Sequence, residues 1–161
     1  MSNIDIHALA RTNRVEELKR AISEGISPDT KDIFGTTALQ YAIAEKSYDA
    51  IAFLLANDID IIVQDKDGKT ALHYAIEYSL LEVAEQLLKK NPKIIAVADK
   101  FGNEPLWTAV FNAKGNYNLV TLLLAYGANP KHCNNVKLTP LDIPKRKGDV
   151  ALLAILESSV K

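Results

Sequence analysis

The chain is poor in the features that would commit it to disulfides, membranes or nucleic acid. It has a single cysteine, Cys133, so no internal disulfide can form, which suits a reducing compartment. Its 19 basic and 20 acidic residues give a formal net charge of −1, too balanced to attract nucleic acid or an anionic membrane. Its apolar runs are far shorter than a membrane span, and its first residues lack the apolar stretch of a signal peptide. We therefore expect a cytoplasmic protein without a nucleic-acid or membrane partner.

Patterns typical of catalysis are also missing. The sequence has no nucleophile–base signature, no phosphate-binding glycine loop and no pair of carboxylates with active-site spacing. We therefore expect no enzymatic activity and no cofactor. One alternative stays open, because His132 and Cys133 are adjacent and could contact one metal ion, which would indicate a metal- or ligand-binding protein or an enzyme. Two ligands without a further cluster make an incomplete metal site.

Similar segments recur along the chain at a spacing of 33 to 35 residues. The clearest are GTTALQYAIAEKSYDAIAFLLA from Gly35, GKTALHYAIEYSLLEVAEQLL from Gly68 and GNEPLWTAVFNAKGNYNLVTLLLA from Gly102. A further copy starts at Lys137, and a degenerate one lies near the N-terminus. A fixed period of this length is typical of repeat proteins, and at about 33 residues per unit the chain holds roughly five units.

The core of these segments carries a family resemblance. It reads Thr-Ala-Leu-His-Tyr-Ala at 70–75, Thr-Ala-Leu at 37–39, Pro-Leu at 105–106 and Thr-Pro-Leu at 139–141. In this core and in its period, the chain resembles the ankyrin repeat over residues 5 to 157. The resemblance implies an all-α solenoid of stacked helix–turn–helix units, with short hairpin fingers between units and no substantial sheet.

We predict a single ankyrin-repeat domain over residues 1–161. Its units are an N-capping repeat at 1–29, inner repeats at 30–61, 62–95 and 96–130, and a C-capping repeat at 131–161. The two end units carry charged residues where inner units carry apolar ones, namely Glu17, Arg20 and Glu157. Because nothing stacks beyond a terminal unit, polar outer faces are expected there, as in a complete solenoid.

Each unit is predicted to hold two short helices. Thr37, Thr70 and Thr139 are suited to cap the first helices, because a hydroxyl can accept from the free amides of a first turn. Pro144 would lie about five residues into the last of these helices, which is therefore expected to be short or kinked. His73 and the equivalent His7 are predicted to make structural hydrogen bonds.

The second helices carry apolar residues at helical spacing. One such stripe cannot be buried within a unit of this size, so the units must stack. We expect Leu54, Leu87 and Leu123 to be buried between them.

The candidate binding surface comes from the ankyrin resemblance. In that family the fingers, here Asp32–Gly35, Asp65–Gly68 and Asp99–Gly102, and the first helices border a concave groove. Apolar finger tips are costly in water unless a partner covers them, and charged neighbours resemble the rim of an interface. The predicted partner-binding residues are Ile33, Phe34, Lys66, Asp67, Lys69, Tyr78, Phe101, Asn103, Trp107, Phe111, Val136 and Leu138. The aromatic residues among them could instead pack finger against finger.

The resemblance implies a non-catalytic module that binds another protein through its concave groove. An inhibitor, an adaptor or an immunity protein against a toxin would each have this design. Alone, the chain is expected to be a monomer. The identity of the partner is not encoded in the pattern.

Overall fold

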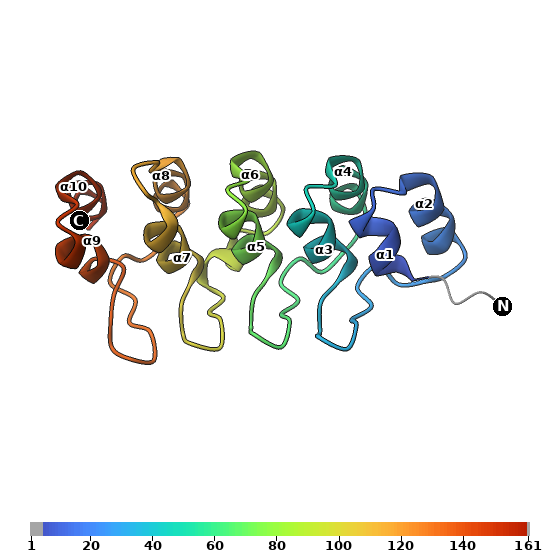
Figure 1. Cartoon of the computed structure of the whole chain (residues 1–161), viewed down its shortest axis with the longest axis horizontal. Coiled ribbons are helices and arrows are strands. Elements are labelled where there is room, and N and C mark those ends of the chain that lie inside the picture. The colour runs from blue at the N-terminus through green and yellow to red at the C-terminus, as the bar shows by residue number, and fades with distance from the viewer. Residues whose placement is uncertain (1–4, 161) are drawn as a thin grey trace.

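The computed structural model describes residues 5–160 as a row of helix pairs with loops projecting along one side (Figure 1). Within these residues every regular element is a helix and none is a strand, so the predicted all-α solenoid is confirmed. The elements are α1 (Ile6–Arg11), α2 (Val15–Ser23), α3 (Ala38–Ala44), α4 (Tyr48–Ala56), α5 (Ala71–Glu77), α6 (Leu81–Lys90), the 3₁₀ helix η1 (Pro92–Ala96), α7 (Pro105–Asn112), α8 (Asn118–Ala125), α9 (Asp142–Lys147) and α10 (Val150–Ser158).

The first helices of the units follow one another along the row, with α1 against α3, α3 against α5, α5 against α7 and α7 against α9. The second helices form a parallel row on the side of the first helices that faces away from the loops (Figure 1). One continuous hydrophobic core runs through all the units, as expected when no unit can bury its own apolar stripe. No helix of the described residues is long and apolar enough to cross a membrane.

Local capping explains where the first helices begin. The backbone amide of Thr37 donates to the Gln40 side chain at 2.8 Å, and the amide of Gln40 donates back to the Thr37 hydroxyl at 3.4 Å. In the next unit the Thr70 amide donates to His73 Nδ1 at 3.1 Å. The bonds are reciprocal at Thr37, and at Thr70 the cap amide is satisfied by the His73 ring. Both residues are the N-caps of their helices, as predicted.

The third predicted cap is wrong by two residues, because the residue that caps α9 is Leu141 and not Thr139. Pro140 and Leu141 form a turn, and α9 begins only at Asp142, whose carboxylate accepts from the Thr139 amide at 2.7 Å. Pro144 therefore lies in the first turn of α9, where an amide would have no helical partner and its absence costs little. The helix is short, as predicted, with six residues.

One element was not anticipated. After α6 the chain continues into η1, which the Asn91 side chain caps by accepting from the Lys93 amide at 3.1 Å. Ile94 of η1 is fully buried in the core. The turn thus closes the third unit with an additional apolar anchor.

We expect Leu54→Ala, Leu87→Ala and Leu123→Ala each to lower the free energy of unfolding by about 2–5 kcal/mol, because each side chain is fully buried and its removal leaves a cavity. Urea denaturation measures the loss. Val150→Ala is the control, since Val150 is 77% exposed. Losses below about 0.5 kcal/mol at all three leucines would contradict the stacking described above.

Candidate functional site: the fingers and the groove beside them

Four fingers project from the row, formed by Asp32–Thr36, Asp65–Lys69, Asp99–Asn103 and Asn134–Leu138 (Figure 1). Each is closed by a bond from the amide of its first residue to the carbonyl of its last. The first side chain also holds the loop from inside, as Asp65 Oδ1 accepts from the amides of Asp67 and Lys69 at 2.8 and 2.9 Å. In the fourth finger Asn134 takes this role for Val136 and Leu138. A short acceptor side chain at the first position therefore shapes every finger.

Backbone hydrogen bonds join the fingers into one row. The amides of Lys66, Lys100 and Asn135 donate to the carbonyls of Phe34, Asp67 and Phe101 at 2.9, 2.9 and 3.0 Å. Adjacent fingers approach so closely that a Cβ on Gly68 would lie 2.6 Å from the Lys100 nitrogen. Gly68 also has a φ of +76°, so both its conformation and its surroundings require glycine.

Tyrosines of the first helices tie the first two fingers to the core. The Tyr41 hydroxyl donates to Asp32 Oδ2 at 2.7 Å, and the Tyr74 hydroxyl donates to Asp65 Oδ2 at 2.8 Å. The bond to Asp32, together with burial, raises the pKa of Tyr41. Burial and the bond to Asp65 raise the pKa of Tyr74 far above its usual range. Both phenols therefore remain neutral donors near neutral pH.

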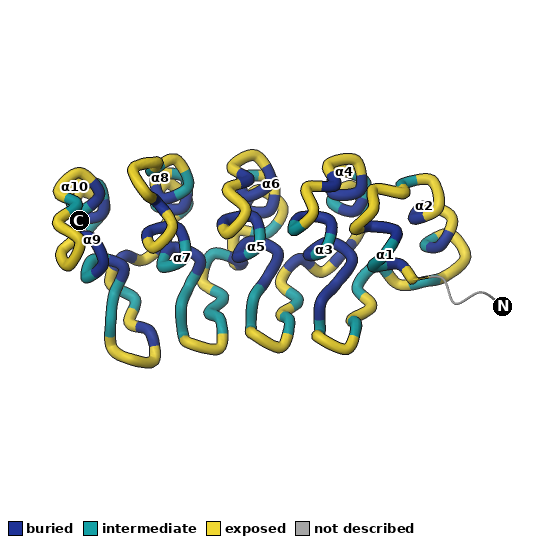
Figure 2. The backbone as a smooth tube through the Cα atoms, in the orientation of Figure 1, coloured by how far each residue is buried: buried dark blue, intermediate teal, exposed yellow. Residues whose placement is uncertain are grey.

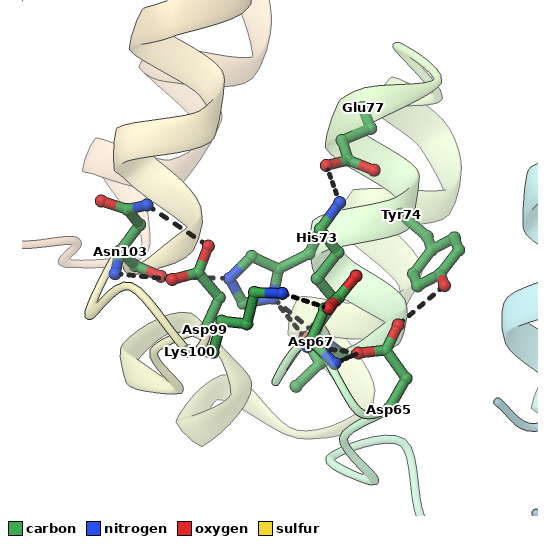
Figure 3. A network of polar contacts seen from close by, with 10 residues as sticks. Asp65, Asp67, His73, Tyr74, Glu77, Asp99, Lys100 and Asn103 are labelled. Carbon is green, nitrogen blue, oxygen red and sulfur yellow. Dashed lines mark hydrogen bonds and ion pairs between the residues drawn. The ribbon is translucent and has the colours of Figure 1, made fainter. Parts of the chain in front are cut away.

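His73 lies between two fingers (Figure 3). Its Nδ1 accepts from the Thr70 amide, and its Nε2 lies 3.3 Å from the Asn103 carbonyl. Such a ring is neutral with its proton on Nε2, and burial lowers the pKa of His73. His7 Nε2 similarly lies 2.9 Å from the Thr30 carbonyl. Both histidines make the structural hydrogen bonds expected of them.

The apolar finger tips are open to solvent (Figure 2). Ile33, Phe34, Phe101 and Val136 are 76, 60, 57 and 70% exposed. Their backbones form the finger row, but their side chains are not covered by the neighbouring finger. Packing of finger against finger therefore does not account for them.

Of the other predicted residues, some are exposed and others are partly buried or bonded to neighbouring residues. On the first helices Phe111 is exposed, whereas Trp107 is half-buried and packs against the core. Leu138 is half-buried. The Asn103 side chain is occupied within the fingers, because it donates to Asp99 at 3.3 Å and accepts from Asn134 at 2.9 Å.

The predicted rim charges are mostly paired. Lys69 Nζ lies 2.5 Å from Glu77 Oε1. Lys100 Nζ lies 2.6 Å from Asp67 Oδ1 (Figure 3). Lys66 is exposed on the second finger. These contacts hold charged side chains in defined positions around the aromatic ones.

An open cleft of about 420 Å³ lies between the first two fingers and helices α3 and α5. It brings together four predicted residues, Phe34, Lys66, Asp67 and Tyr78. The cleft is also lined by Thr36, Ala44, Glu45 and Asp65, and by two residues that the sequence analysis missed, Tyr41 and Tyr74. The recurrence of tyrosine at 41 and 74, one period apart, was a usable signal for both. Phe101, Phe111 and Val136 do not line this cleft.

The alternative based on His132 and Cys133 finds no support in their contacts. His132 Nδ1 lies 3.3 Å from Glu104, and its Nε2 lies 3.0 Å from the Gly102 carbonyl, so both ring nitrogens are engaged. Burial raises the pKa of Glu104 despite the nearby His132. Cys133 is exposed, and residues 5–160 contain no group of three or more His, Cys, Asp or Glu side chains placed to hold a metal ion.

We expect Gly68→Ala to destabilise the fold more than Gly127→Ala does. Both glycines have a positive φ, which costs alanine about 1–2 kcal/mol. Only at Gly68 would the added Cβ meet backbone, because nothing lies within 4 Å of a Cβ on Gly127. The clash should lower the free energy of unfolding, measured by urea denaturation, by at least about 1 kcal/mol more. Equal losses would mean that the fingers are not held in close contact.

His73→Gln should be tolerated better than His73→Ala. Glutamine occupies the equivalent position in the preceding unit, where Gln40 Nε2 donates to the Val63 and Lys69 carbonyls at 3.1 and 2.9 Å. Alanine would leave buried groups of Thr70 and Asn103 without partners, at about 1–3 kcal/mol. Urea denaturation of the two variants compares the losses, and a smaller loss for alanine would contradict the assigned role.

The same histidine predicts a dependence of stability on pH. Because burial lowers the pKa of His73 below its usual 6.5, the unfolded chain takes up the proton first as pH falls. The wild-type protein should therefore lose stability below pH 6.5, relative to its value at neutral pH. The difference between wild type and His73→Gln across pH 7.5 to 5 (roughly the range in which histidine titrates) isolates this contribution. A constant difference would contradict it.

Comparison with known proteins agrees with this geometry. The family model described as "Ankyrin repeats (3 copies)" matches residues 6–97 and 61–134. The chain is 33% identical over 128 residues to the mouse B-cell lymphoma 3 protein homolog, covering 77% of this chain and 28% of that protein. It is 33% identical over 127 residues to a putative ankyrin repeat protein of Rickettsia bellii (strain RML369-C), covering 75% of this chain and 36% of the relative.

A more distant relative is the human transient receptor potential cation channel subfamily A member 1, 25% identical over 160 residues. That match covers 94% of this chain but 14% of the channel protein. This chain thus spans only a minor part of the length of each of these relatives. The recurring sequence, the stacked helix pairs and these matches together place the chain in the ankyrin-repeat family.

Proposed function

We propose that this chain binds another protein through the concave surface made by its fingers and first helices. Ankyrin repeats are generally protein-interaction modules and not catalysts. The observation that carries the proposal is the cleft of about 420 Å³ in which the finger-tip residue Phe34 and the helix residue Tyr78 face the same space. They are 60 and 39% exposed. Aromatic anchors seated in a pocket dominate the energetics of many interfaces.

The rigidity of the surface supports the same function. Each finger is closed internally and joined to a neighbour by a backbone bond, and the first two fingers are also tied to a helix by a tyrosine, as at Asp65 and Tyr74. A preformed surface loses little conformational entropy when a partner docks. The row of fingers is therefore suited to tight binding without rearrangement.

We place the chain in the cytoplasm, where an exposed free thiol such as that of Cys133 remains reduced. It acts there as a monomer that captures one partner, as an inhibitor, an adaptor or an immunity protein would. Copurification from the native host with a single protein at a stoichiometric ratio would identify that partner.

The test is an alanine scan against the copurified partner. Alanine at the true anchors among Phe34, Tyr78, Phe101, Trp107 and Phe111 should weaken binding by about 2 kcal/mol or more. Isothermal titration calorimetry measures the affinities, and circular dichroism checks that each variant remains folded.

Tyr48→Ala is the matched control, because Tyr48 is 57% exposed, like Phe101 and Phe111, but lies on the second helix α4. Exchange of Glu82 or Glu85 on α6 should also have little effect. Changes at Lys69 or Glu77 should mainly alter the association rate and its dependence on salt. If Tyr48→Ala abolishes binding while the finger aromatics tolerate alanine, the groove is not the binding surface.

A further inference from the structure

We propose that the cleft between the first two fingers binds an arginine side chain from a basic segment of the partner. This inference rests on the proposed protein-binding function and specifies the chemistry of the ligand.

Four aromatic residues line the cleft, namely Phe34, Tyr41, Tyr74 and Tyr78. They come from the first finger, from α3, from the middle of α5 and from the residue that follows α5. The hydroxyls of Tyr41 and Tyr74 are held by Asp32 and Asp65, which fixes both side chains in place. Several aromatic residues around one open space attract a cation through their π faces.

The charge of the lining favours the same ligand. Three carboxylates, from Glu45, Asp65 and Asp67, share the cleft with one ammonium group, that of Lys66. Asp67 is paired with Lys100 at 2.6 Å, and the neighbouring Lys69 and Glu77 pair with each other. The two remaining carboxylates exceed the single lysine, so the cleft keeps an excess of negative charge. An acidic side chain of a partner would be repelled.

The other exposed aromatic residues of the groove already carry a cation from this chain. Lys100 Nζ lies 5.1 Å from the ring centre of Phe101, and Lys147 Nζ lies 4.9 Å from that of Phe111. Within residues 5–160 no such cation lies over Phe34 or Tyr78. The residue before Phe101 is Lys100, whereas the residue before Phe34 is Ile33. A lysine of the chain itself thus lies over the ring at the third finger tip, whereas at the first finger tip the equivalent place over Phe34 is open to a cation of a partner.

Arginine fits this site better than lysine does. Its planar guanidinium can stack on an aromatic face and, at the same time, donate two parallel bonds to a carboxylate. The cleft offers both elements, since Glu45 lies with Phe34 and Tyr78 in its lining. Lysine, a strongly hydrated point charge, should bind there less tightly.

The test uses N-acetyl-arginine methylamide as the probe, titrated into the whole chain and followed by NMR. The corresponding citrulline derivative is the neutral control of nearly equal shape, and the lysine derivative is the cationic one. We expect saturable shifts of Phe34, Tyr41, Tyr74 and Tyr78, with arginine binding at least about fivefold tighter than citrulline. Equal affinities, no saturable binding, or shifts located elsewhere on the chain would overturn the proposal.

Variants sharpen the assignment. Phe34→Leu and Glu45→Gln should each weaken binding of the arginine probe several-fold, whereas Phe101→Leu should not, although Phe101 is a finger-tip ring of similar exposure. Ile33→Lys would place an internal cation beside Phe34 and should weaken binding, while Ile33→Gln should not. Unchanged affinity in Phe34→Leu, or equal losses in Phe34→Leu and Phe101→Leu, would also overturn the proposal.

These results separate this inference from the broader function. If groove variants abolish binding of the copurified partner but the arginine probe binds no better than citrulline, the arginine site is wrong and the groove function stands. If the probe binds in the cleft but groove variants do not affect the partner, the cleft has affinity for arginine but does not hold an arginine of that partner, and the groove function is wrong.

Discussion

The fold depends on stacking between units, because a pair of short helices is too small to bury its own apolar residues. Leu54, Leu87 and Leu123 are fully buried in a core that runs through all the units. Each helix pair is therefore stable only with its neighbours, and stability becomes a sum over units and the interfaces between them. The spacing of one unit from the next fixes the spacing of everything attached to it.

The fingers are attached to the units, so they have the same spacing and together form one surface. Adjacent units bring Lys66 to Phe34 and Lys100 to Asp67 at 2.9 Å, close enough for a backbone bond. The same approach excludes any side chain at Gly68. The backbone groups of the fingers make the bonds between neighbours, and the side chains at the tips face solvent. Because the apolar side chains of Phe34 and Phe101 are not needed for those bonds, they are available to contact a partner.

Much of this arrangement could be predicted from the amino-acid sequence. The period revealed the repeats, helical spacing identified the buried leucines, and the residue types of the turns located the finger tips at which Phe34 and Phe101 are exposed. These features depend on local pattern. The division of the chain into capping and inner repeats remains a prediction.

Other features depend on contacts between units and could not be read in the same way. Tyr41 and Tyr74 occupy helical positions that a core residue could also hold, and their role depends on carboxylates in the fingers. The contact of His132 with the Gly102 carbonyl joins residues 30 positions apart. The helix α9 begins later than predicted because Pro140 and Leu141 form a turn. The sequence could not show this, because proline is also common at the first position of a helix.

Hydrogen exchange tests most directly whether a partner is recognised on the finger side of the stack. Exchange would be compared for the chain alone and in complex with its partner, and followed by mass spectrometry of peptides. We predict slower exchange in peptides covering the first two fingers and the ends of α3 and α5, with α4, α6 and α8 unchanged. Protection confined to these second helices, with no change in the fingers, would contradict the account.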